Sequence, residues 1–235
     1  LSDSVSAYTI DADSGALSPI GLPVAAGDGP TALGIEPTGR FAYVVNTNDD
    51  TIVSYAINAM TGARIWSAQK SCGTLSNCKE VADMNWSFPA DLSFVDRNND
   101  GRTDRLYAVD TGGNLWRVDI NDADTSNWVV TKLAALGCST GVCASGTPRK
   151  FFFPPSVISV GATGAAGSFD AVLLGSGDRE HPLQSVSDAT SSLYVQNRFY
   201  MIKDTATGMS VATKDAAAPA LPMTEQVMDS LATAA

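Results

Sequence analysis

Short runs in which apolar and polar residues alternate dominate the sequence, and turn-forming residues separate them. The clearest are SVSAYTI (4–10), RFAYVV (40–45), TIVSYAI (51–57) and RLYAVD (105–110). A period of two is typical of strands that bury one face. Helical periodicity is confined to residues 223–235. The pattern predicts an all-β protein with one short helix near its end.

An internal repeat predicts how the strands are arranged. SVSAYTIDADSGAL (4–17) aligns with TIVSYAINAMTGAR (51–64), 47 residues further on. The intervening stretch (29–50) adds two strands and two turns, so one unit holds about four short strands, the size of a propeller blade. The 235 residues amount to about five such units. We therefore predict a β-propeller over residues 1–215, followed by an Ala- and Pro-rich linker and the short helix over 216–235.

Large aromatic residues recur within the repeats. In a radial array each sheet is covered by its neighbours, so these side chains are expected to pack between blades. The prediction concerns Tyr8, Tyr55, Trp66 and Trp116.

Charge narrows the choice of partners. The chain carries 25 acidic and 15 basic residues, a formal net charge of -10. This balance disfavours nucleic acid or an anionic membrane and suits a divalent cation. No run of eighteen apolar residues and no leader pattern is visible, so we expect no membrane-spanning segment; the first residue, Leu1, suggests a mature or excised piece.

The four cysteines form two close pairs in loop-like stretches, Cys72 with Cys78 and Cys138 with Cys143. Short disulfides in such loops indicate an oxidising compartment. The spacings of five and four residues differ from the two typical of structural zinc sites, and the only histidine, His181, lies far along the chain. We predict two disulfides, with zinc ligation or free thiols as the alternatives.

An acidic stretch, DRNNDGRTD (96–104), concentrates repelling carboxylates in a chain of which only 17% is charged. Calcium-binding loops place oxygen ligands at positions one, three, five and nine, with a backbone carbonyl at seven and glycine at six. Gly101 occupies position six. The predicted ligands are Asp96, Asn98, Asp100, Arg102 through its carbonyl, and Asp104.

The surroundings of this loop set its type. Position twelve is Tyr107 instead of the bidentate Glu of an EF-hand, which predicts a strand-loop-strand site of micromolar affinity. The alternative is a solvated turn without an ion. A second acidic stretch, DINDAD (119–124), lacks the spacing and the glycine and is expected to be an exposed turn.

Catalytic motifs are not found. There is no Gly-x-Ser-x-Gly, no His-Glu-x-x-His and no phosphate-binding Gly-x-x-x-x-Gly-Lys. The segment GSGDREHP (175–182) groups acidic, basic and histidine side chains, but neighbours on an extended segment point to opposite faces. We expect a structural or partner-binding loop there, and no enzyme.

Residues 1–62 resemble blades of the YVTN-type, lactonase-like seven-bladed propellers, through SVSAYTIDADSGALSPIG and EPTGRFAYVVNTNDDTIVSYAI. This resemblance implies a blade structure, and the chain would then be an incomplete part of a seven-bladed ring. The lactonases work with histidine, acidic and basic side chains in a central channel, and residues 1–62 contain no histidine. YAINAMTGARIW (55–66) also resembles the structural blade repeat of quinoprotein dehydrogenases.

From about residue 63 to 215 the chain resembles the C-terminal propeller domain of the PilY family of type IV pilus biogenesis proteins and tip adhesins. The similar stretches are DLSFVDRNNDGRTDRLYAVDTGGNLWRVDI, PRKFFFPPSV, DAVLLGSGDREHPL and VQNRFYMIKD. The resemblance implies a calcium-binding module that regulates pilus extension, retraction and adhesion. Its implied partners are pilins or minor pilins and a surface or host receptor, at the pilus tip or outer surface of a Gram-negative bacterium. A lactonase-like or quinoprotein-like enzyme without its active site here is the alternative.

Overall fold

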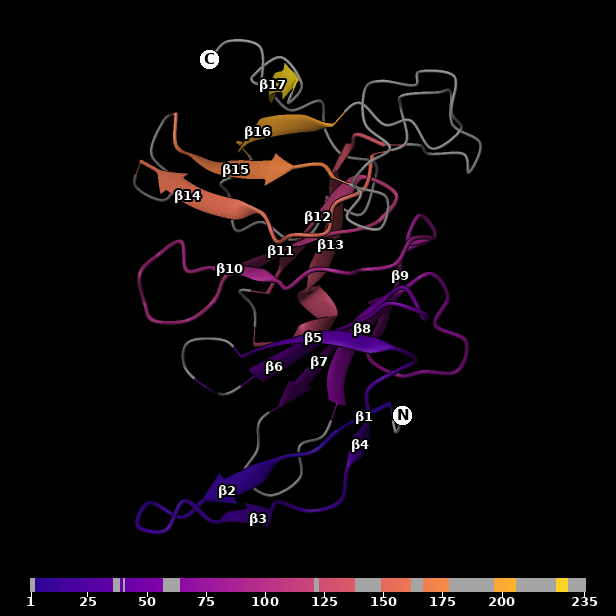
Figure 1. Cartoon of the computed structure of the whole chain (residues 1–235), viewed down its shortest axis with the longest axis vertical. Coiled ribbons are helices and arrows are strands. Elements are labelled where there is room, and N and C mark those ends of the chain that lie inside the picture. Colours follow the sequence, from indigo (N-terminus) through magenta and orange to yellow (C-terminus); the bar gives the residue numbers. More distant parts are fainter. Residues whose placement is uncertain are drawn as a thin grey trace.

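The computed structural model describes residues 3–35, 39, 41–56, 64–120, 123–137, 149–161, 167–177 and 197–205, and the backbone of 223–227. Three sheets of four or five strands follow one another along the chain (Figure 1). The first contains β5 (Pro30–Ile35), β6 (Phe41–Asn46), β7 (Thr51–Ala56), β8 (Arg64–Gln69) and β9 (Cys78–Glu80). The second contains β10 (Ser93–Val95), β11 (Arg105–Val109), β12 (Asn114–Asp119) and β13 (Val129–Ala135). The third contains β14 (Ser156–Val160), β15 (Phe169–Gly175), β16 (Arg198–Asp204) and β17 (Met223–Val227).

Two short ladders precede these sheets. They join β1 (Ser4–Val5) to β4 (Val24–Ala25), and β2 (Tyr8–Ile10) to β3 (Leu17–Pro19). Every pairing is antiparallel except the parallel contact of β8 with β9. The described residues include a single helix, the three-residue 3-10 helix Thr125–Asn127. The predicted all-β class is confirmed: the chain forms part of a β-propeller.

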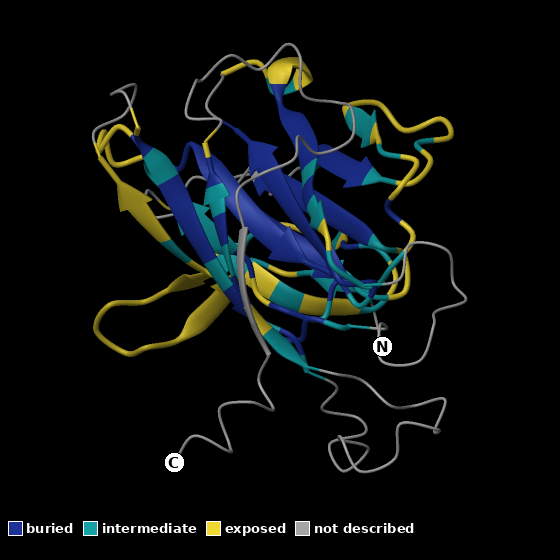
Figure 2. Ribbon diagram, turned by 90° about the horizontal axis from the view of Figure 1, so that it is seen from above, coloured by how far each residue is buried: buried dark blue, intermediate teal, exposed yellow. Residues whose placement is uncertain are grey.

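Apolar cores lie between successive sheets, because alternate residues of each strand face opposite neighbours. In β11, Leu106 and Ala108 face the first sheet, while Tyr107 and Val109 face the third. Trp66 of the first sheet packs on Trp128, with ring centroids 5.5 Å apart. Figure 2 shows buried strands enclosed by exposed loops and edges.

The predicted packing of the aromatic residues is confirmed for Tyr55, Trp66 and Trp116, which are at most 2% exposed. The prediction for Tyr8 is wrong, because its side chain is 50% exposed. The hairpin of β2 and β3 stands apart from the larger sheets (Figure 1). The repeat therefore predicts a strand in both copies, but not whether a neighbouring layer covers that strand.

The helix predicted over 223–235 is wrong where the structure describes it. Residues Met223–Val227 form β17 and pair antiparallel with β16. The backbone groups of β16 would otherwise form an open sheet edge, and pairing them outweighs the weak helical preference of so short a segment. Residues 228–235 lie outside the described part of the chain.

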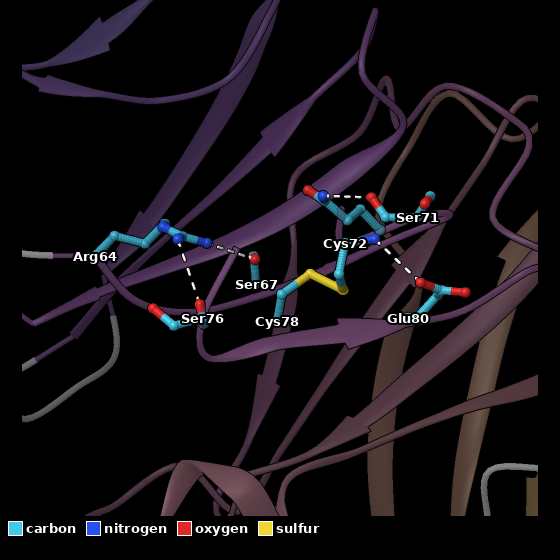
Figure 3. Close-up of a disulfide and its surroundings, with 8 residues drawn as sticks. Arg64, Ser67, Ser71, Cys72, Ser76, Cys78 and Glu80 are labelled. Atoms are coloured by element: carbon cyan, nitrogen blue, oxygen red, sulfur yellow. Dashed lines mark hydrogen bonds between the residues drawn. A yellow bond between two sulfur atoms is a disulfide. The ribbon is translucent and has the colours of Figure 1, made fainter. Parts of the chain in front are cut away.

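One of the two predicted disulfides is present (Figure 3). Cys72 and Cys78 are bonded, with Cα atoms 5.8 Å apart. The bond closes the connection between the parallel strands β8 and β9, where the Cys72 N–H donates to Glu80 Oε2 at 3.3 Å. Disulfide formation excludes zinc ligation and free thiols for this pair. Cys138 and Cys143 lie outside the described residues.

Within the described residues, no helix has the length and apolar character needed to cross a bilayer.

Candidate functional site: an acidic loop beside a buried charge network

The predicted calcium loop joins two paired strands. It leaves β10 after Val95 and enters β11 at Arg105, and these two residues are register partners. The Asp104 N–H donates to the Val95 carbonyl at 2.9 Å, which closes the base of the loop. The strand-loop-strand position expected from the sequence is therefore observed.

The first half of the loop turns its oxygen atoms toward its own backbone. Asp96 Oδ2 accepts the Gly101 N–H at 2.8 Å, Asn98 Oδ1 accepts the Asp100 N–H at 2.9 Å, and Asp100 Oδ1 accepts the Arg102 N–H at 2.8 Å. Gly101 has a φ of 83°, a conformation that glycine adopts without a steric penalty. These bonds hold the side chains of positions one, three and five around one turn.

Asp104, at position nine, is buried at the foot of the loop. Its Oδ2 accepts the N–H groups of Arg97 at 2.7 Å and Asn98 at 3.2 Å. Burial raises the pKa of Asp104, the negative charges of Asp96 and Asp100 raise it further, and the two N–H donors oppose the shift. The three carboxylates are thus close enough to repel one another.

Asp96 carries an atom that lacks a partner. Its Oδ1 is buried and takes part in no hydrogen bond, although a desolvated carboxylate oxygen is costly to leave unpaired. The described residues hold no assembled group of three or more His, Cys, Asp or Glu side chains that could bind a metal. An ion would therefore draw these carboxylates together and displace part of their bonding to the backbone.

The donor set suits calcium. Carboxylate, amide and carbonyl oxygens are hard ligands that Ca²⁺ accepts in flexible arrangements. A bound cation would offset the repulsion among the carboxylates and pair with Asp96 Oδ1. Arg102 lies in the exposed turn, and its carbonyl remains a predicted ligand.

A buried network of charges adjoins the loop, and sequence reasoning did not anticipate it. Its members lie at the facing surfaces of the second and third sheets and are at most 5% exposed: Arg97, Arg105, Arg117, Asp119, Asp170 and Asp204. Arg105 Nη1 lies 2.8 Å from Asp170 Oδ2, and Arg117 Nη1 lies 2.5 Å from Asp204 Oδ2. The Nε–H groups of Arg105 and Arg117 donate to Asp119 Oδ1 and Oδ2, each at 3.0 Å.

Hydroxyl groups complete this network. The Tyr107 hydroxyl lies 2.9 Å from Asp170 Oδ2 and 3.0 Å from Asp204 Oδ2. Burial raises the pKa of Tyr107, and the two aspartates add to the shift. Burial alone would raise the pKa of Asp170, but its hydrogen bonds from Ser159 and Tyr107 and the nearby arginines lower it overall. Asp170 therefore stays ionised inside the protein.

The acidic stretch 119–124 differs from the exposed turn that we expected. Asp119 is the last residue of β12 and is 5% exposed, because it pairs with two buried arginines. Asp124 is exposed and accepts the Ser126 N–H at 2.9 Å. The segment Asp178–His181 lies outside the described residues.

The sheets and their order define the class of the protein: part of a β-propeller with an acidic loop. Residues 1–74 match the family model described as Lactonase, 7-bladed beta-propeller. Over 114 residues the chain is 24% identical to the Type IV pilus biogenesis factor PilY1 homolog of Xylella fastidiosa, and this match covers 48% of the chain and 8% of that protein. The fold is similar to the crystal structure of the Pseudomonas aeruginosa PilY1 C-terminal domain, with a TM-score of 0.51 and 17% identity.

The likeness to that domain covers 93% of this chain and 45% of the solved chain. The comparisons confirm both resemblances predicted from the sequence: lactonase-like blades near the N-terminus and similarity to the PilY family.

Proposed function

We propose that the chain is a calcium-binding propeller module of a type IV pilus assembly or tip adhesin protein. The similarity to a pilus biogenesis factor and to a PilY1 domain supports its association with pili. Pilins or minor pilins and a surface or host receptor are its proposed partners, at the outer cell surface. In this proposal the module binds and does not catalyse.

A single observation carries the calcium proposal: Asp96 Oδ1 is buried without a partner in a loop whose carboxylates repel one another. The ligand spacing from Asp96 to Asp104 and the positive φ of Gly101 match the needs of a calcium loop. Calcium would convert this repulsion into coordination, and its binding would stabilise the folded state.

Titration calorimetry of chelator-stripped protein with calcium chloride tests the proposal. Three carboxylates without a bidentate Glu predict a Kd on the order of micromolar. Calcium at about 100 times Kd stabilises the fold by about 2.7 kcal/mol, which raises the Tm of a chain of this size by about 5–10 °C. No heat of binding and an unchanged Tm would overturn the proposal.

Asp100→Ala should abolish the calcium-dependent rise in Tm, because it removes the ligand at position five. Asp91→Ala is the matched control, since Asp91 is also exposed and lies five residues before the loop. An undiminished rise in the Asp100 variant would remove this loop as the binding site.

The match of residues 1–74 to the lactonase family favours one alternative, an enzyme. Lactone and alcohol turnover should therefore be assayed in the protein used for calorimetry. Calcium binding without turnover supports the binding module. Turnover that is independent of calcium would favour the enzyme.

The pilus role is tested in the bacterium that carries the gene. Asp100→Ala in the chromosomal copy should change the calcium dependence of twitching motility and of surface attachment, whereas Asp91→Ala should not. Equal responses of the two strains to calcium chelation would contradict the regulatory role.

A further inference from the structure

An arginine at each end of the acidic loop contacts the third sheet. Arg97 follows Asp96, Arg105 follows Asp104, and both arginine side chains are at most 5% exposed. Arg97 Nη1 bonds to Asp170 Oδ1, and Arg105 Nη1 lies 2.8 Å from Asp170 Oδ2. Two residues that adjoin proposed cation ligands thus hold the same carboxylate of β15.

The loop carboxylates also hold the backbone from which Arg97 projects. The Arg97 N–H donates to Asp104 Oδ2 at 2.7 Å, so Asp104 is tied directly to the main chain of Arg97. Asp104 is itself fixed at both of its backbone groups: its N–H donates to the Val95 carbonyl, and its carbonyl accepts the Ile120 N–H at 2.8 Å. Between the proposed cation ligands and the Arg97 guanidinium, the only side chains involved are therefore those of Asp104 and Arg97 itself.

Asp170 links these two arginines to the other strands of the third sheet. It lies in β15, is fully buried, and its Oδ1 also accepts a hydrogen bond from the Ser159 hydroxyl of β14 at 2.8 Å. Tyr107 bridges Asp170 to Asp204 of β16, where Arg117 is bound. Since an uncompensated buried charge is strongly unfavourable, the arginines can shift only together with their aspartate partners.

We propose that the loop and the third sheet form one coupled unit, in which a divalent cation at the loop fixes Arg97 and Arg105 against Asp170 and so tightens the packing of the third sheet on the second. The coupling rests on the proposed cation site. It is reciprocal: loss of the Arg97–Asp170 contact weakens cation binding.

Hydrogen exchange of the whole chain, with calcium and with chelator, tests this coupling without any substitution. Peptides covering β15 and β16 should exchange more slowly with calcium, although neither strand belongs to the loop. Peptides covering β6 and β7 of the first sheet are the internal control, because they report only the overall stabilisation by calcium, and their exchange should slow less than that of β15 and β16. Protection confined to residues 95–105, in protein shown by calorimetry to bind calcium, would overturn the coupling and leave the calcium site intact. Absence of binding would overturn both.

A substitution measures the reciprocal effect. Arg97→Lys keeps the charge but cannot reproduce the planar contact, and its calcium Kd should rise about fivefold or more. Arg64→Lys is the matched control, because Arg64 lies in β8 of the first sheet and bonds to Ser67 Oγ at 2.7 Å; its Kd should equal that of the wild type. A wild-type Kd together with wild-type protection of β15 in folded Arg97→Lys protein would overturn the proposal. If that variant does not fold, the exchange experiment on the wild type decides alone.

Discussion

Asp110 is a buried carboxylate that accepts several hydrogen bonds. It lies in the turn between β11 and β12 and is fully buried. Trp116 Nε1 donates to its Oδ2 at 2.7 Å, and the N–H groups of Gly112 and Asn114 each donate to its Oδ1 at 2.9 Å. Burial nevertheless raises its pKa to about 6, against the effect of these hydrogen bonds.

This shift predicts a pH dependence of stability. The folded state binds a proton more readily than the unfolded state between the ordinary pKa of 3.8 and about 6. The stabilisation from this group is thus complete below about pH 4 and is lost as the pH rises through 6, a change of about 3 kcal/mol. Asp110→Asn should remove this slope from the free energy of unfolding measured by chemical denaturation between pH 4 and 7.

The control for this pH dependence is Asp91→Asn, because Asp91 is exposed. It should retain the slope of the wild type. An equal slope in Asp110→Asn would assign the pH dependence to another group.

At the scale of residues, the sequence located the loop but not its neighbours. The spacing from Asp96 to Asp104 is a local property, so the strand-loop-strand position could be predicted. Arg105 and Asp170 are 65 residues apart, and no local pattern pairs them. One signal was available: charged residues occupy the same parity as core residues in RLYAV and FDAVLLG. Alternation alone does not tell which face of a strand is covered.

At the scale of elements, the turn after β11 depends on two glycines packed against each other. Gly113 has a φ of 78°, and a Cβ atom there would lie 2.6 Å from the Arg149 carbonyl oxygen and from Gly137 backbone atoms. Gly15 has a similar φ of 70° but no atom within 4 Å of the corresponding position. Comparing Gly15 with Gly113 therefore separates the energetic cost of a positive φ from the cost of a steric clash with neighbouring backbone atoms.

Gly15→Ala should lower the free energy of unfolding by about 1–2 kcal/mol, the cost of a left-handed conformation. Gly113→Ala adds a backbone clash and should cost about 1–3 kcal/mol more. Urea denaturation of both variants measures the difference. Equal losses would show that the approach of Gly137 and Arg149 relaxes freely.

The disulfide between Cys72 and Cys78 provides a second prediction for an element. Closing so short a loop reduces the freedom of the unfolded chain, so Cys72→Ser/Cys78→Ser should destabilise the protein by about 2 kcal/mol. The measurement is the midpoint of denaturation. The control is Thr74→Ala, an exposed position inside the same loop. A double variant as stable as Thr74→Ala would show that the disulfide does not contribute to the free energy of unfolding.

Element boundaries were predictable where alternation and turn residues agreed, as in Phe41–Asn46 and Thr51–Ala56. Two of the failed predictions share a cause. The side chain of Tyr8 and the backbone of 223–227 depend on which element lies beside them: β2 pairs with β3 apart from the larger sheets, while β17 adds to the edge of β16. A periodic pattern records a preference of the segment, whereas an adjacent sheet edge is a property of the fold.

At the scale of the whole molecule, two different interfaces hold the three sheets in series. The first and second sheets meet through aromatic and aliphatic side chains, including Tyr43, Trp66 and Trp128. The second and third meet through an apolar cluster at one end, including Val172 and Tyr200, and through the arginine and aspartate network at the other. Neighbouring units in such an array stabilise one another mainly through their shared interfaces.

Asp170→Asn should therefore act on one interface more than on the other. It removes a charge that Arg97 and Arg105 share, and the loss of one partner in a buried ion pair costs about 3–5 kcal/mol. Asp83→Asn is the control: Asp83 pairs with Lys132 at 2.7 Å, but its side chain is 66% exposed, so the loss should be at most about 1 kcal/mol. The stabilisation from Asp170 also requires its ionised form, because its pKa is lowered in the folded state. This stabilisation is lost as the pH falls below the ordinary pKa of 3.8.

The position of the tryptophans makes the weakened interface visible. All four, Trp66, Trp86, Trp116 and Trp128, lie in or beside the first two sheets, so their fluorescence reports on those sheets, while far-ultraviolet circular dichroism reports on all three. If the ionic network makes the third sheet cooperate with the second, wild-type unfolding curves from the two methods should coincide. In Asp170→Asn, circular dichroism should begin to change at lower denaturant than fluorescence, because the third sheet separates first. Coincident curves at a lower midpoint would mean that the apolar cluster alone keeps the sheets cooperative.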